Sequence, residues 1–376
     1  MNLDRGQVSV ALLATLAALT GAAVTPVHLE LKSSSSEKQW HLQYLKATQA
    51  HTLNQGENVI VAVLDTGVSP HPDLGGNLLK GADLIQGGSS VGRSDSSGHG
   101  TGMAGLIAAT GRGGSAQGIA PQSKVLPVVV TPPDGRGDPD VLAEGIDFAA
   151  SQGAKVISIS SVGGASPKLV QAIRTATAAD ITIVAAAGNR PEDAFVGYPA
   201  VEESVIAVGG IDRTGNHAAI SVAGPEIDVV APAVDIYSTG LNKGYRVGTG
   251  TSDATAIVAG AAALIRSKYP NLPAQEVAHR LTATAVDKGP PGRDDQYGYG
   301  VIDLVAALTA DVPPLGFESS NVTPPASAEA APDKGDDGSA TVRGLATLGV
   351  LVAAGGGYLF WRRRRRADDP PPRVSR

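Results

Sequence analysis

The sequence predicts an α/β fold for residues 38–309, with a doubly wound, mostly parallel sheet flanked by helices. Several short runs are apolar or β-branched without alternating polar residues, as expected of parallel strands covered on both faces. These runs are residues 59–64, 124–130, 156–160, 181–186 and 205–208. Helical segments accompany them at residues 102–110, 141–152, 167–179 and 255–268. Strand–helix–strand repetition at this spacing is typical of a doubly wound sheet.

The composition allows a large buried core and excludes several classes of function. Hydrophobic residues make up 42% of the 376 residues, enough for one large domain with appendages. The chain contains no cysteine, so disulfides, thiol catalysis and cysteine metal sites are excluded. A formal net charge of -6 gives no general reason to expect nucleic acid as a partner, and we predict none.

The first residues have the pattern of a secretory signal peptide. Arg5 precedes an apolar stretch without charge at residues 8–24, and Gly21 and Ala23 offer a small-x-small cleavage site. We therefore expect a signal peptide at residues 1–23 and a short extension at residues 24–37. The alternative is an uncleaved N-terminal anchor.

The other end has the pattern of a membrane anchor. Residues 344–361 form an uncharged run of 18 residues, about 27 Å long as a helix, and five arginines follow at once. A basic cluster beside an apolar span marks the cytoplasmic side, which explains these arginines better than a nucleic-acid site does. We predict a single-pass protein of the cell membrane, with a cytoplasmic tail at residues 362–376. Residues 310–343, rich in Pro, Ala and Asp, would be an extracellular linker.

Asp65 is the first candidate for chemistry. It ends the apolar run Val-Ala-Val-Leu and is followed by Thr66 and Gly67. Ligands and catalytic groups gather at the carboxyl ends of strands in open α/β sheets, and a carboxylate there can orient an imidazole. Alone, the motif is weak, because it also occurs in aspartic proteases and a strand-end Asp often caps a turn.

His99 stands in the segment Ser-Gly-His-Gly-Thr-Gly-Met-Ala-Gly, where it opens a helix of small residues. The glycines leave room around the ring and let the helix approach a neighbouring backbone closely. The alternative is an ordinary surface or core histidine, since short motifs produce false matches.

Ser252 lies in Gly-Thr-Gly-Thr-Ser-Asp-Ala-Thr, at the start of an Ala-rich helix. The amide and the dipole of a helix start favour developing negative charge, which suits a serine nucleophile whose attack creates an oxyanion. The alternative is a simple N-cap residue.

Asn189 follows the apolar run Ile-Val-Ala-Ala-Ala and a glycine. Its side chain could donate the second hydrogen bond to an oxyanion, whose loss typically costs about 10²–10³ in rate. The alternative is an ordinary turn residue.

Taken together, Asp-Thr-Gly, His-Gly-Thr, Ala-Gly-Asn and Gly-Thr-Ser, in this order, resemble the subtilisin-like serine peptidases, the subtilases. The resemblance covers about residues 40–308. It implies that Asp65 orients the ring, that His99 is general base and then acid, and that Ser252 attacks the carbonyl. Asn189 and the Ser252 amide would form the oxyanion hole. The expected activity is a serine endopeptidase acting on polypeptides without a cofactor.

The resemblance also implies two strand edges that bind an extended substrate by strand addition. The matching residues are Gly135, Arg136, Gly137, Ser160, Ser161 and Val162. Without the family, both segments are equally well explained as ordinary Gly-rich loops. Val162 stands where the family usually has Gly beside the specificity pocket, so its bulk should favour small residues before the cut bond.

The sequence departs from the family pattern after the nucleophile. Asp253 and Ala256 stand near positions where subtilases commonly have Met and Pro. A carboxylate close to a developing oxyanion opposes catalysis unless it faces solvent. The rival interpretation is therefore a weakly active or inactive subtilase-fold scaffold. A lipase or esterase is disfavoured, because the order is Asp, His, Ser and no Gly-x-Ser-x-Gly elbow is present.

The layout of the chain resembles the mycosins, membrane-anchored proteases associated with type VII secretion in actinobacteria. Cleavage after Ala23 would leave about 40 residues before Asp65, too few for a separately folded inhibitory pro-domain. The resemblance implies a protease that processes a secreted substrate or helps hold a secretion complex together. Many subtilases bind structural calcium, but no spacing of carboxylates marks a site here, and we predict no metal residue.

Overall fold

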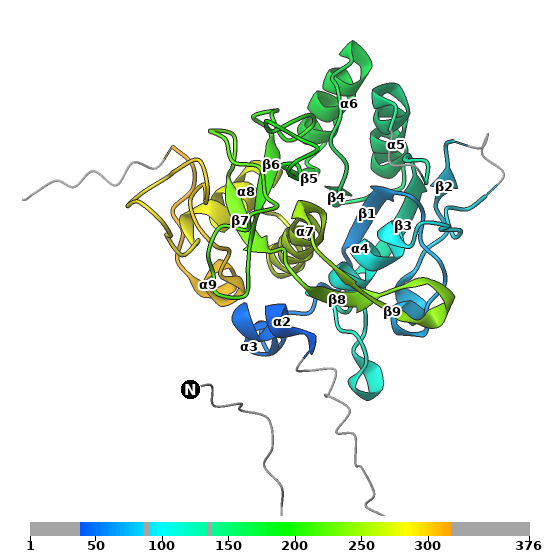
Figure 1. The fold of residues 1–376 in the computed structure, drawn as a ribbon, viewed down its shortest axis with the longest axis horizontal. Coiled ribbons are helices and arrows are strands. Elements are labelled where there is room, and N and C mark those ends of the chain that lie inside the picture. The colour runs from blue at the N-terminus through cyan, green and yellow to red at the C-terminus, as the bar shows by residue number, and fades with distance from the viewer. Residues whose placement is uncertain (1–37, 86–89, 134–136, 317–376) are drawn as a thin grey trace, which may run out of the picture. The chain divides into compact units, whose positions relative to one another are not determined.

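The computed structural model describes residues 38–85, 90–133 and 137–316, and its core is a seven-stranded sheet (Figure 1). The strand order is β2-β3-β1-β4-β5-β6-β7, and every recorded pairing within this sheet is parallel. The strands are β1 (Ile60–Asp65), β2 (Ala82–Asp83), β3 (Lys124–Val129), β4 (Val156–Ile159), β5 (Thr182–Ala186), β6 (Val205–Ile211) and β7 (Val229–Pro232). The predicted doubly wound, mostly parallel sheet is confirmed.

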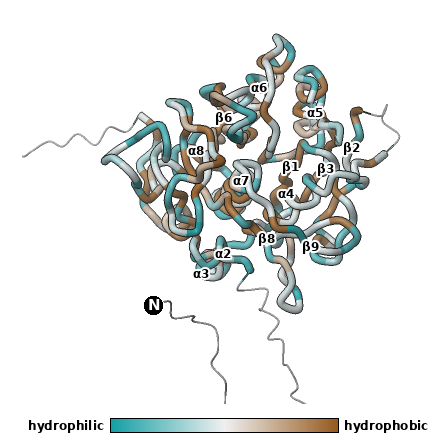
Figure 2. The backbone as a smooth tube through the Cα atoms, viewed as in Figure 1, coloured by the Kyte–Doolittle hydropathy of each residue, from teal (hydrophilic) through white to brown (hydrophobic). Residues whose placement is uncertain are grey.

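Helices cover both faces of this sheet. α4 (His99–Ala108) and α7 (Thr251–Lys268) pack against each other and against the central strands, while α5 (Pro139–Ser151) and α6 (Pro167–Ala178) form a second pair (Figure 1). Every residue of β4, β5, β6 and β7 is buried, which explains why these strands lack polar alternation. In Figure 2 the hydrophobic colour gathers around the strands, and the hydrophilic colour lies on peripheral loops.

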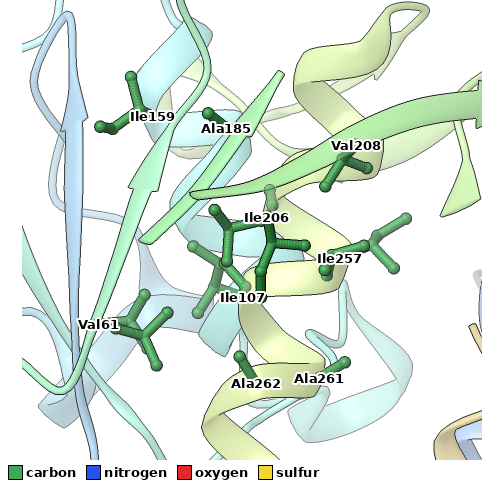
Figure 3. Packing of buried hydrophobic residues seen from close by; sticks show 14 of the residues in the cluster. Val61, Ile107, Ile159, Ala185, Ile206, Val208, Ile257, Ala261 and Ala262 are labelled. Atoms are coloured by element: carbon green, nitrogen blue, oxygen red, sulfur yellow. The ribbon is translucent and has the colours of Figure 1, made fainter. Parts of the chain in front are cut away.

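α7 is buried on all sides rather than along one stripe. Residues 251–266 are all buried, as expected of a helix that is apolar or small around its whole circumference. Figure 3 shows Ile257, Ala261 and Ala262 of this helix among the buried side chains of the sheet and of α4. Gly260 lets α7 pack tightly against Ile119, because a Cβ on this glycine would lie 2.7 Å from Cβ of Ile119.

The structure corrects several predicted bounds. α4 and α7 start three and four residues earlier than predicted, at His99 and Thr251. Glycine and threonine have low helix propensity, so the periodic pattern missed these first turns, whereas the motifs placed His99 and Ser252 at helix starts, as the structure has them. The remaining strands and α-helices were not predicted. They are β2, β7, the antiparallel hairpin β8 (Ile236–Thr239) and β9 (Tyr245–Gly248), and the helices α2 (Trp40–Tyr44), α3 (Ala47–His51), α8 (Ala274–Ala283) and α9 (Leu304–Thr309).

The hairpin β8–β9 lies against the first turns of α4. Ser238 Oγ donates to the carbonyl oxygen of Gly102, and Thr239 Oγ1 donates to that of Thr101, both at 2.7 Å. The hairpin is therefore held to the helix by hydrogen bonds from its side-chain hydroxyls to the helix backbone. The attachment places β9 beside the residues that start α4 and α7.

No helix within residues 38–85, 90–133 and 137–316 is both long and apolar enough to cross a bilayer. The predicted signal peptide (1–23), anchor (344–361) and basic tail (362–376) lie outside the described residues, as does most of the predicted linker.

Candidate active site

The candidate residues meet at the carboxyl ends of the parallel strands. A cleft of about 350 Å³ lies there, next to the last residue of β1 and the loops that follow β4 and β5. Its lining includes Asp65, His99, Asn189 and Ser252. A larger hollow of about 750 Å³ lies at the opposite, amino ends of β5 and β6 and contains none of these four residues. The position of the smaller cleft is the one that open α/β sheets use for ligands.

Asp65 and His99 form the best-defined contact of the cleft. Nδ1 of His99 lies 2.8 Å from Oδ1 and 3.0 Å from Oδ2 of Asp65. A carboxylate only accepts, so Nδ1 carries the proton and Nε2 of the neutral ring is left as an acceptor. Asp65 is 3% exposed, whereas the side chain of His99 is 31% exposed on the cleft side. The Asp65 carboxylate raises the pKa of His99 above its ordinary value of 6.5, against the opposing effect of burial.

Gly100 explains why the histidine stands among small residues. A Cβ at this position would lie 3.1 Å from Oδ1 and from Cβ of Asp65 and would overlap the carbonyl oxygen of Gly67. Any larger residue would therefore push the start of α4 away from the end of β1. The close approach of these two backbones is what brings His99 onto Asp65.

Asp95 supports the same junction and was missed in the sequence. Its carboxylate accepts from Thr66 Oγ1 at 2.9 Å, from Thr101 Oγ1 at 2.6 Å and from the Gly98 amide at 2.8 Å. It thus ties the turn after β1 to the first turn of α4. A signal existed, because an aspartate just before a helix start is a common capping residue for the free amides there.

Ser252 is the second residue of α7, so its backbone N–H has no acceptor within the helix. The residue is only 7% exposed, yet it lines the cleft with His99. Its Oγ donates to the carbonyl oxygen of Ser160 at 3.0 Å. In the described part of the chain, no hydrogen bond joins Ser252 to His99. The structure therefore brings the hydroxyl into the same cleft as the imidazole but directs it at the loop after β4.

Asn189 is oriented by the residue before the candidate nucleophile. Its Oδ1 accepts from the backbone N–H of Thr251 at 2.8 Å and from the Thr251 hydroxyl at 3.2 Å. A backbone N–H can only donate, so the atom facing it is the oxygen, and Nδ2 is left as a donor. The Asn189 backbone is fixed by Asp193, whose Oδ2 accepts from the Asn189 N–H at 2.8 Å.

Asp253, the residue after Ser252, does not face solvent. It is 1% exposed, and its Oδ1 lies 3.2 Å from Nη1 of Arg246 on β9. Burial raises the pKa of the Asp253 carboxyl above its ordinary value, whereas Arg246 and His99 act in the opposite direction. No sequence motif singles out Arg246.

The predicted substrate-binding residues are only partly described. Gly135 and Arg136 lie outside the described residues, whereas Gly137 borders a shallow hollow together with Ser161 and Val162. Ser160 contacts the candidate nucleophile.

Val162 fills space beside the cleft. A Cβ on Gly197 would overlap Cγ1 of Val162, so this side chain occupies the gap between its own loop and the segment around Gly197. Val162 also lines the cleft that holds Ser252. The side chain is therefore part of the wall of the cleft that also contains Ser252.

Within residues 38–85, 90–133 and 137–316, no group of three or more His, Asp or Glu side chains could hold a metal ion. The buried charges of the cleft are instead satisfied by hydrogen bonds and by the Arg246 pair.

Comparison with known proteins identifies the family. Residues 56–300 match the subtilase family, peptidase S8. Subtilisin DY of Bacillus licheniformis is 40% identical over 259 residues, which cover 67% of this chain and 92% of the relative. Subtilisin BL of Lederbergia lenta is 38% identical over 271 residues, which cover 71% of this chain and 97% of the relative.

Solved structures agree with this family. MycP1 from Mycobacterium smegmatis has a TM-score of 0.66 at 30% identity, covering 75% of this chain and 87% of that one. MycP3, described as a protease from the type VII (ESX-3) secretion system, has a TM-score of 0.64 at 32% identity, covering 73% and 88%. With its parallel sheet, its cleft and the match over residues 56–300, the chain belongs to the subtilase family of serine peptidases.

Proposed function

We propose that this chain is a serine endopeptidase that cuts secreted or cell-surface proteins through Asp65, His99 and Ser252. The observation that carries the proposal is the bond between Asp65 and Nδ1 of His99, in the same cleft as Ser252. This bond leaves Nε2 free to accept a proton on the cleft side, as a general base requires.

The proposed reaction starts with a turn of the Ser252 hydroxyl away from the Ser160 carbonyl and towards Nε2 of His99. His99 takes the proton as Oγ attacks the substrate carbonyl, and Asp65 stabilises the imidazolium that forms. His99 then gives the proton to the leaving amine, and water hydrolyses the acyl-enzyme by the same steps. Nδ2 of Asn189 and the Ser252 N–H would donate to the oxyanion.

We propose that the peptidase acts outside the cell, tethered to the membrane. The support is in the sequence: residues 1–23 have the pattern of a signal peptide, and residues 344–361 that of an anchor with cytoplasmic arginines. Gly135, Arg136, Gly137, Ser160, Ser161 and Val162 would line the bound polypeptide. The polypeptide would bind to these strand edges by strand addition, through main-chain hydrogen bonds.

We also propose a role beside a type VII secretion system. Structures similar to this chain are described as a MycP3 protease from the ESX-3 system and as a MycP1 protease essential to ESX-1. The layout of the chain supports the same setting. Its partners would be a secreted polypeptide substrate and proteins of the secretion complex, with no part for nucleic acid.

A scaffold with little activity is the second candidate. Two observations favour it: Ser252 Oγ bonds to the Ser160 carbonyl rather than to His99, and a buried carboxylate, Asp253, follows the nucleophile directly. Such a protein would keep the subtilase fold for binding partners without cutting them.

A fluorophosphonate probe separates the two candidates. We expect the wild type to be labelled and Ser252→Ala to lose both labelling and, by at least about 10⁴-fold, peptide hydrolysis. Ser267→Ala is the matched control, since it removes a hydroxyl from the same helix, α7, but outside the cleft, and should keep both. An unlabelled wild type with native folding would favour the scaffold.

The pKa of His99 tests the role of Asp65. General-base catalysis needs the neutral ring, which is present only above the raised pKa, so activity should be lost as the pH falls through a value above 6.5. Asp65→Asn keeps the shape but removes the charge, and burial then dominates. We expect NMR titration of His99 in this variant to give a lower pKa than in the wild type, because the largest cause of the raised pKa is gone. An unchanged pKa would contradict the assignment.

The size of Val162 should set a preference for small residues before the cut bond. We expect the wild type to cut a peptide library mainly after Ala, Ser or Gly. Val162→Gly should improve cleavage after Phe or Leu relative to Ala by at least about 10-fold, the lower end of what one methylene is worth in a hydrophobic pocket. Preferred cleavage after Phe or Leu by the wild type would refute this account of Val162.

A further inference from the structure

Arg246 and Asp253 form an ion pair that the reaction described above does not use. Nη1 of Arg246 lies 3.2 Å from Oδ1 of Asp253, and these side chains are 25% and 2% exposed. Arg246 comes from β9, and Asp253 is the third residue of α7, directly after Ser252. The pair therefore joins the hairpin to the helix start that carries the nucleophile.

Two glycines make room for this pair. A Cβ on Gly102 would lie 2.7 Å from Cδ of Arg246, and a Cβ on Gly248 would lie 2.6 Å from Oδ1 of Asp253. In both cases the added atom would also overlap the guanidinium. Gly102 is in α4, three residues after His99, so the guanidinium passes close to the helix that positions the imidazole. The slot is thus built from α4, β9 and α7 together.

The charges around His99 come from four elements. Asp65 on β1 contacts the ring, Asp95 precedes α4, Arg246 lies on β9 and Asp253 on α7. α4 and β8 contribute no other charged side chain. Asp65 does most to raise the pKa of His99, Asp253 raises it as well, and Arg246 lowers it.

The two charges of the pair therefore act on the ring in opposite directions. Alone, the Asp253 carboxylate would strengthen the imidazolium and oppose negative charge on a substrate held by Ser252. Alone, the guanidinium would weaken the base, since arginine does not lose its proton in proteins. When Arg246 and Asp253 are paired, their effects on the pKa of His99 oppose each other, and Asp65 remains the main influence on that pKa.

Building on the proposed function, we propose that Arg246 and Asp253 are positioning residues that cancel each other's charge beside His99 and Ser252. They fix the hairpin and the first turn of α7 against α4 while adding no net charge where the oxyanion develops. The Asp253 carboxylate, which alone would oppose catalysis, is then one half of an ion pair without net charge.

The pH profile of kcat/KM tests this inference. Asp253→Asn leaves the guanidinium unpaired near the ring, so we expect the acid limb to move to lower pH by about 0.5 unit. The double variant Asp253→Asn with Arg246→Met removes both charges and should return the limb to its wild-type position. An acid limb that stays in place in Asp253→Asn overturns the inference, whatever happens to the melting temperature.

The controls keep a structural effect apart from an electrostatic one. Glu144→Gln removes a carboxylate from an exposed pair with Lys168, 2.6 Å from its Nζ, and should not move the limb. Should Asp253→Asn fail to fold, Asp253→Ala makes the same change of charge with a smaller side chain and carries the same expectation. Active-site titration with a fluorophosphonate tests the proposed function separately from the role of the ion pair. A labelled enzyme with an unmoved limb rejects only the pair, whereas an unlabelled wild type rejects the proposed function and the pair with it.

Discussion

The close approach of α4 to the end of β1 is the constraint on which the site depends. It exists because Gly100 has no side chain to hold the backbones apart and because Asp95 bonds to both segments. The hydrogen bond between Asp65 and His99 is a consequence of that approach, as are the choice of protonated nitrogen and the raised pKa of the ring. The parallel sheet brings the strand ends to one edge, and the small residues allow α4 to lie close to the end of β1.

The second half of the site is the start of α7. Its burial on all sides fixes the helix in the core, so the free amides of its first turn have a fixed direction. The Thr251 N–H bonds to Oδ1 of Asn189, so Nδ2 of Asn189 is available as a donor. Asp253 pairs with Arg246, which therefore lies beside the start of the helix. One short stretch of sequence thus places the proposed nucleophile, the proposed donors to the oxyanion and a charge pair.

The sequence predicted the parts of this site that are local. Asp65 and Asn189 could be found because each follows an apolar strand and lies in a short motif, and the sheet follows from runs without alternation. The burial of Asp253 could not be predicted, since it depends on Arg246, which reaches it only because a hairpin folds back over α4. The supporting role of Asp95 depends on contacts between separate segments, and only its capping position was visible beforehand.

A crystal structure with a peptide boronic acid tests the central claim most directly, because boron bonded to serine copies the tetrahedral intermediate. The account predicts that boron bonds to Ser252 Oγ, which has left the Ser160 carbonyl. One boronate oxygen should lie about 3 Å from both Nδ2 of Asn189 and the Ser252 N–H. Nε2 of His99 should face the adduct while Nδ1 stays on Asp65. An adduct at another residue, or a Ser252 hydroxyl still bonded to Ser160 in saturated crystals, would contradict it.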